Sequence, residues 1–217
     1  EPDNLIPLPN TYLAPIIHLH SGQTVRINFN NSLTEETIVH WHGLHLPPEA
    51  DGHPSHAISP GEIYVYEFEV LDRAGTYWYH PHPHGRTAFQ AYMGLAGLVL
   101  VSDAAEATLN LPTGIHDLPQ VIQDRTFAAN NQLVYSANNN VTGFLGEQIL
   151  VNGQPTPIQT VENVPYRLRL LNGSNARIYK LAWADATPLT VIGTDGGLLE
   201  TAVQRNYITL APGERIE

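Results

Sequence analysis

The chain has 217 residues, a formal net charge of −11 and no cysteine. This length can bury one large core or two modest ones, and the acidic balance argues against a nucleic-acid partner, since phosphate backbones are bound through Lys and Arg. The lack of cysteine excludes disulfides, Cys-ligated zinc, thiol nucleophiles and a blue-copper site within this chain. No apolar run reaches membrane-spanning length, so no membrane partner is expected.

Alternating apolar and polar residues in short runs predict an all-β fold of the β-sandwich kind. Residues 1–15 contain four prolines and are expected to form an irregular lead-in. A short helix is predicted over residues 87–93, ended by Gly94. Strands are predicted in the first half of the chain at residues 24–29, 38–46, 63–70, 75–80 and 96–101.

Small residues, Pro and Gly then predict a linker at residues 104–118, which divides a first domain (1–103) from a second (119–217). The second domain has its own series of short apolar runs. Strands are predicted there at residues 119–123, 148–151, 166–171, 179–183, 189–193 and 207–210.

The second series resembles a copy of the first. Residues 25–32 (VRINFNNS) resemble 166–174 (YRLRLLNGS), and 59–62 (SPGE) resemble 211–214 (APGE). On this alignment the second domain lacks counterparts of residues 66–101, and a sandwich without those strands leaves open edges and an uncovered apolar face. We therefore expect the missing strands to come from another polypeptide or from a cleaved continuation of this one.

Two His-x-His pairs, His40-Trp41-His42 and His80-Pro81-His82, lie on strand-like segments. Residues i and i+2 of a strand point to the same face, so each pair projects two imidazoles in one direction. Neutral imidazole is the commonest protein ligand for transition metals. Two such strands side by side would bring four ring nitrogens together. From the residues alone, a copper site, a mononuclear zinc or iron site, and plain polar strand positions remain alternatives.

The sequence around these pairs resembles the multicopper oxidases, the family of laccases, bilirubin oxidases and bacterial cuprous oxidases. The resemblance is closest to the bacterial three-domain members and implies tandem cupredoxin-like Greek-key β-sandwiches, with the second incomplete in this chain. It lies in residues 40–44 (HWHGL), 78–87 (WYHPHPHGRT), 94–98 (GLAGL), 167–177 (RLRLLNGSNAR) and 194–198 (TDGGL).

The resemblance implies an oxidase that couples one-electron oxidations of a substrate to the four-electron reduction of O2 to water. By position, His40 would bind the type 2 copper, and His42, His80 and His82 the type 3 pair of a trinuclear cluster. The other cluster histidines and the type 1 copper would lie in a third domain outside this chain. The implied partners are that remaining part of the oxidase, O2, and a small-molecule or metal-ion reductant.

Asp51 falls where the family places an acidic residue near the cluster. This implies a catalytic role in orienting a copper-bound water and relaying protons, whereas Asp51-Gly52 could also be simply a turn. His84 is expected to form hydrogen bonds around the cluster. His18 and His20 form a third pair, either facing solvent or binding adventitious metal.

Two other functions stay open. The chain could be a copper-free structural or assembly relative of the same fold, although retention of all four histidines argues against this. It could also be a simple copper-binding protein that uses those histidines alone. The family implies an extracellular or periplasmic location, and since no basic and apolar leader is visible, any signal peptide would already have been removed.

Overall fold

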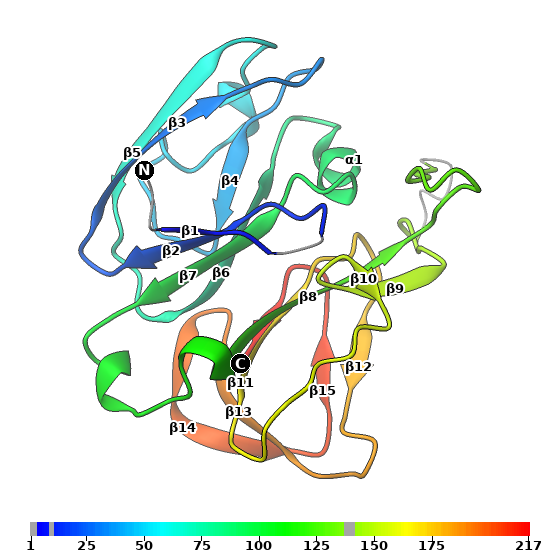
Figure 1. Ribbon diagram of the computed structural model, residues 1–217. Coiled ribbons are helices and arrows are strands. Elements are labelled where there is room, and N and C mark those ends of the chain that lie inside the picture. The colour runs from blue at the N-terminus through cyan, green and yellow to red at the C-terminus, as the bar shows by residue number, and fades with distance from the viewer. Residues whose placement is uncertain (1–3, 9–10, 137–141) are drawn as a thin grey trace.

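The computed structural model describes residues 4–8, 11–136 and 142–217, so residues 1–3 and 9–10 of the predicted lead-in lie outside it. Figure 1 shows two groups of strands, with β1–β7 and helix α1 in one and β8–β16 in the other. The predicted all-β fold is confirmed. None of the described helices is long and apolar enough to cross a membrane.

The first group is a sandwich of two sheets. Its larger sheet runs in the order β1-β2-β7-β6-β4, with β2 and β7 parallel and the other neighbours antiparallel. Its strands are β1 (Leu5–Ile6), β2 (Ile16–His20), β7 (Gly97–Ser102), β6 (Gly75–Pro81) and β4 (Val39–His42). The smaller sheet is the antiparallel pair of β3 (Thr24–Asn30) and β5 (Ile63–Glu69). Helix α1 (Thr87–Tyr92) follows β6, as predicted.

The core of this sandwich lies between the two sheets. Trp41 and Tyr77 come from the larger sheet, Tyr66 and Phe68 from the smaller one, and all four are buried. Burying each such side chain stabilises the fold by about 1.5–3 kcal/mol. Apolar and polar residues alternate in β3 and β5 because each strand has one face against this core and the other toward solvent, as inferred from the sequence.

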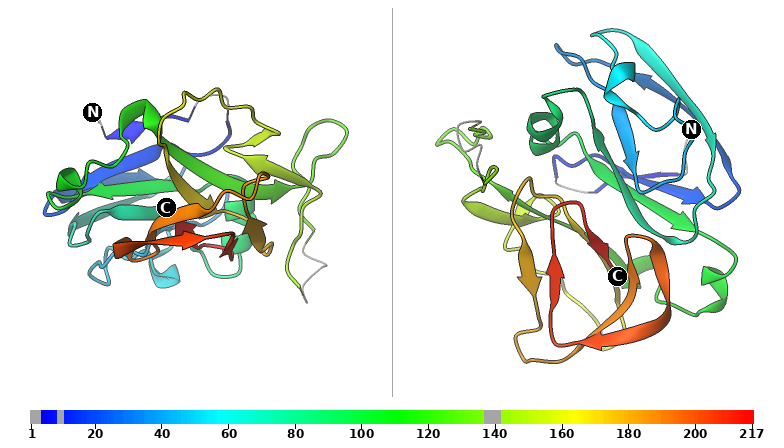
Figure 2. Two further views of the ribbon diagram at one scale, coloured as in Figure 1. Left: turned by 90° about the horizontal axis from the view of Figure 1, so that it is seen from below. Right: turned by 180° about the vertical axis from the view of Figure 1, so that it is seen from behind.

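The second group contains one five-stranded sheet and two two-stranded sheets, seen from two further sides in Figure 2. The sheet has the order β10-β9-β8-β11-β16, and β8 and β11 are parallel. Its strands are β8 (Asp117–Arg125), β9 (Gln148–Val151), β10 (Gln154–Pro155), β11 (Arg167–Asn172) and β16 (Arg215–Ile216). The two-stranded sheets pair β12 (Tyr179–Leu181) with β15 (Ile208–Leu210), and β13 (Leu189–Thr194) with β14 (Gly197–Arg205), and the second pair is a hairpin.

Short 3-10 helices occupy parts of the connections. The first, η1 (Pro54–His56), follows β4. Two more, η2 (Glu106–Thr108) and η3 (Gly114–His116), lie in the segment predicted as a linker, and β8 begins directly after them.

The two copies of the internal repeat form the same hydrogen bonds. The side-chain amide of Asn31 donates to two backbone carbonyls, and that of Asn172 does the same. The backbone N–H of Gly61 donates to the Asn31 carbonyl at 2.7 Å, and that of Gly213 donates to the Asn172 carbonyl at 2.9 Å. Both glycines have φ near +80°, where a side chain would be strained. The sequence repeat therefore encodes one loop structure used twice.

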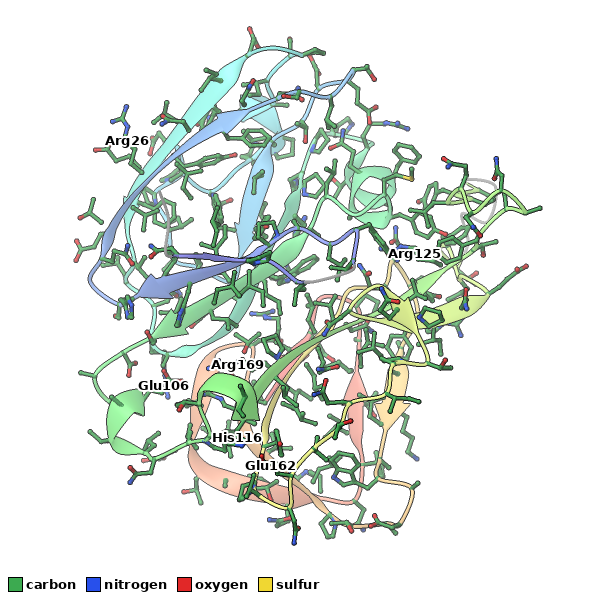
Figure 3. All side chains as sticks on the ribbon, in the orientation of Figure 1. Arg26, Glu106, His116, Arg125, Glu162 and Arg169 are labelled. Carbon is green, nitrogen blue, oxygen red and sulfur yellow. The ribbon has the colours of Figure 1, made fainter. Side chains whose placement is uncertain are left out.

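A buried ion network joins the two groups of strands. Glu217 accepts a hydrogen bond from the Thr76 hydroxyl of β6 at 2.6 Å and pairs with Arg169 at 3.1 Å and with Arg167. Arg167 also pairs with Glu106 at 2.7 Å. Figure 3 shows Arg169 and Glu106 near the junction of the two groups. Because removing one partner of a buried pair leaves an uncompensated charge, this network fixes how the groups meet.

The structure differs from the prediction at several elements, among them β1, which lies in the segment expected to be an irregular lead-in. The strand expected to reach Leu46 ends at His42, because Gly43 takes a φ of +95° and turns the chain. Strand β14 was not predicted at all. Its central residues are exposed on both faces, so it lacks the alternation that marks a strand with one face on a core.

Candidate metal centre

Strands β4 and β6 bring the two His-x-His segments together. They pair antiparallel, with His40 opposite His80 and His42 opposite Trp78. His82 follows directly after the end of β6 at Pro81. The four imidazole rings lie together beside β4, the edge strand of the larger sheet, with centroids of neighbouring rings 5.3–5.7 Å apart.

His40 is oriented by the turn at Asp51. Its Nδ1 lies 2.7 Å from the Asp51 carbonyl oxygen and 3.5 Å from the Asp51 carboxylate. A carbonyl oxygen only accepts, so Nδ1 carries the proton and Nε2 keeps its lone pair for a metal. Asp51-Gly52 is indeed a turn, and its backbone holds the imidazole.

His80 is oriented in the same way by its own backbone neighbour. Its Nδ1 donates to the Pro81 carbonyl at 2.9 Å, which leaves Nε2 as the free acceptor. That Nε2 lies 3.3 Å from Nδ1 of His42. Two nitrogens that are each about 2 Å from one metal ion, at a near-tetrahedral angle, are separated by roughly this distance.

Burial keeps two of these rings neutral. It lowers the pKa of His80 to about 3, against a smaller opposing effect of the Pro81 carbonyl, and the nearby histidines lower it further. Burial also lowers the pKa of His42 to about 4, with a further contribution from the positive charge of Arg215. Both rings are therefore uncharged at neutral pH, the form that binds a metal.

His40, His42 and His80 each offer a ring nitrogen within 4.8 Å of the others. His82 lies outside that group of three, although its ring is 5.3 Å from that of His40, and its buried Nδ1 has no hydrogen-bond partner among the described residues. The set is made of imidazoles alone, which suits copper, zinc or iron. These residues fit copper, since three ring nitrogens lie within 4.8 Å of one another and a buried ring nitrogen of His82 lacks a partner among the described residues.

The other candidate residues lie at or beyond the margin of this cluster. The Asp51 carboxylate is partly exposed beside His40, and His84 is exposed after Pro83. The rings of His18 and His20 are 5.5 Å apart on β2, and His20 Nδ1 bonds the Ser102 hydroxyl at 2.7 Å. The structure therefore does not bring this third pair into the cluster.

A cavity of about 330 Å³ lies beside His42 and His80. The second group of strands lines its far side, through residues that include Leu171 and Gly213. Sequence reasoning did not assign residues of the second group to the site. The repeated Pro-Gly loop was visible in the sequence, but nothing there indicated that one copy would face a histidine.

The geometry agrees with three comparisons. The sequence model that describes multicopper oxidases matches residues 2–106. The chain is 42% identical over 205 residues to the multicopper oxidase mco of Staphylococcus epidermidis, covering 94% of this chain and 46% of that protein. It is also 38% identical over 208 residues to the cell division protein FtsP of Escherichia coli, covering 95% and 44% respectively.

Solved structures show the same likeness. The McoA multicopper oxidase from the hyperthermophile Aquifex aeolicus matches with a TM-score of 0.89 and 48% identity, over 93% of this chain and 46% of that one. The laccase-like multicopper oxidase CueO from Ochrobactrum sp. matches with a TM-score of 0.90 and 37% identity, over 96% and 48%.

The fold is that of tandem cupredoxin-like sandwiches, with the second one incomplete in this chain. The resemblance to the multicopper oxidase family seen in its histidine motifs is thereby confirmed. It spans less than half the length of the curated relatives named above.

Proposed function

We propose that this chain supplies half of the protein ligands of a trinuclear copper cluster in a laccase-like oxidase. The observation that supports this most directly is that His40, His42 and His80 each offer a ring nitrogen within 4.8 Å of the others, with the His42 and His80 rings neutral. In this proposal His40 binds the type 2 ion, and His42, His80 and His82 bind the type 3 pair. The bound copper would supply one-electron redox chemistry toward O2.

Within that site the residues of the chain orient ligands and handle protons. The carbonyls of Asp51 and Pro81 hold the Nδ1–H groups of His40 and His80 and so direct their Nε2 atoms inward. The Asp51 carboxylate is placed to accept or release a proton beside His40, since it is 3.5 Å from that ring and partly exposed.

The proposal requires a partner segment for the remaining copper ligands and the electron entry site. The second group of strands has a large apolar cavity of about 560 Å³, lined by residues that include Trp183, Ile192 and Ile208. Two of its lining residues, Trp183 and Val161, are about half exposed. Apolar surface of this kind is what strands completing the second sandwich would cover. We propose that these strands and the third domain complete the oxidase.

Copper binding is the first test. The full chain is loaded with Cu(II), freed of excess metal, and its bound copper is measured by mass spectrometry, alongside H42Q, H80Q and the exposed-histidine control H53Q. We expect the two site variants to lose copper and the control to retain it. Equal copper in all four proteins would contradict the assignment of these ligands.

Oxidase activity is the second test. Uptake of O2 with a phenol or Cu(I) as reductant is measured for the chain with and without a segment that carries a His-Cys-His sequence. We expect uptake only when that segment is present, and its loss in H42Q. Uptake by this chain alone would exclude a split cluster.

A copper-free structural role is the alternative, and the 38% identity to the cell division protein FtsP favours it specifically. The grouping of His40, His42 and His80, with one ring nitrogen of each within 4.8 Å of the others, favours the oxidase over it, because a structural hydrogen bond between two of these rings does not require the third. A copper-loaded chain that keeps no metal would reverse this preference. In either case we propose an extracellular or periplasmic location, as the family implies.

A further inference from the structure

Arg215 carries a buried guanidinium from the second group of strands to the histidine-bearing strands of the first. Its side chain is only 3% exposed. Its Nε donates to the Thr76 carbonyl of β6 at 3.0 Å. On the other side it is held by Asp195, whose carboxylate lies 2.9 Å from Nη1 and whose carbonyl accepts from Nη2 at 3.0 Å.

The same guanidinium packs directly on the residue that follows His42. A Cβ at Gly43 would lie 2.7 Å from Nη2 of Arg215 and 3.1 Å from the ring of Tyr77. Glycine is therefore required at this position by the φ of +95° and by the guanidinium. Arg215 thus contacts the residue that follows β4 and the start of β6, the two strands whose pairing brings His42 and His80 together.

The internal repeat shows that this contact is not a general feature of the loop. Ile63 pairs with Asn30 in the first copy, and Arg215 pairs with Leu171 in the second, so the two residues hold the same place. Ile63 is 62% exposed, whereas Arg215 is buried against the neighbouring group of strands. A buried cation where the other copy presents an exposed aliphatic residue needs a local reason.

We propose that Arg215 is a positioning residue for the copper site, and that its charge weakens the binding of Cu(II) relative to Cu(I). This inference rests on the proposed function of the four histidines. The hydrogen bond to Thr76 and the contact with Gly43 fix β4 against β6. A fixed positive charge in a buried setting repels a dication more than a monocation, so it shifts the preference of the site toward the reduced ion.

The test compares dissociation constants for Cu(I) and Cu(II), each measured anaerobically by competition with a chelator on the full chain. In R215M we expect the ratio of the two constants to move about tenfold in favour of Cu(II). R215K keeps the charge and should hold the ratio near that of the parent. D195N removes the partly exposed counter-charge and should move the ratio the opposite way, by a few-fold.

R167M is the matched control, because Arg167 is equally buried at the same junction but pairs with Glu106 and Glu217. It should lower stability without moving the ratio. An unchanged ratio in R215M and D195N, with copper still bound by the parent, overturns this inference alone. If R215M does not fold, D195N decides. A parent chain that binds neither Cu(I) nor Cu(II) overturns both this inference and the proposed function.

Discussion

Replacing Gly52 by alanine should displace His40 and destabilise the first sandwich. Gly52 has a φ of +82°, and a Cβ there would lie 2.5 Å from the carbonyl carbon of Val39 and 2.8 Å from Cα of His40. The positive φ costs about 1–2 kcal/mol. The overlap is with backbone that cannot rotate away, so β4 must shift at a further cost of about 1–3 kcal/mol. We expect G52A to lose about 2–5 kcal/mol in free energy of unfolding.

Gly61 provides the matched control. Its φ is +83°, but a Cβ there would meet no atom within 4 Å, so G61A should lose only the backbone cost of about 1–2 kcal/mol. Urea unfolding of both variants measures the difference, and a copper-binding titration shows whether His40 has moved. If G52A and G61A are equally stable, the close packing of Gly52 on β4 is wrong.

Three further changes test other parts of the structure. Y66F removes the hydroxyl that accepts from the N–H of Val39 and donates to its carbonyl, both at 2.9 Å. The free energy of unfolding, measured by thermal unfolding, should fall by about 1–3 kcal/mol. Copper binding should also weaken. The hydrogen bond and charge of Asp72 raise the pKa of His45. The pair therefore stabilises the fold fully below the ordinary histidine pKa, and this stabilisation is lost as the pH rises through the raised pKa. In D72N, an NMR titration should show a lower His45 pKa than in the parent. E217Q leaves two buried arginines without their shared carboxylate and should cost about 3–5 kcal/mol in urea unfolding, whereas an unchanged midpoint would show that the network is not needed.

Much of the fold could be predicted because a strand with one face on a core alternates visibly in sequence. Strands β3 and β5 have that pattern, and the sequence placed them to within a residue at each end. That the two histidines of each pair point to one face also follows from alternation, since i and i+2 share a face, whereas the pairing of β4 with β6 comes from the structure. Whether those histidines bind copper stays a prediction, as do the domain boundaries and the catalytic role of Asp51.

The parts that could not be predicted depend on backbone groups and on long-range contacts. His40 and His80 are oriented by the carbonyls of Asp51 and Pro81, and every residue has a carbonyl, so no residue type marks this role. Arg215 is separated from Gly43 by most of the chain, and only the packed structure shows that they touch. The central residues of β14 are exposed and are held by pairing with β13, so its sequence carries no such signal there.

The repeated loop shows most clearly where sequence stops being informative. Its shape is local, because an Asn side chain and a Gly with positive φ form the same hydrogen bonds in both copies. Its surroundings are not local. A Cβ at Gly61 would meet nothing, whereas one at Gly213 would lie 3.7 Å from Cε1 of His42 and 3.5 Å from Trp78. The same loop therefore faces solvent in one sandwich and, in the other, packs against a ring of the candidate metal centre, so the group of strands without the four clustered histidines helps to shape the site.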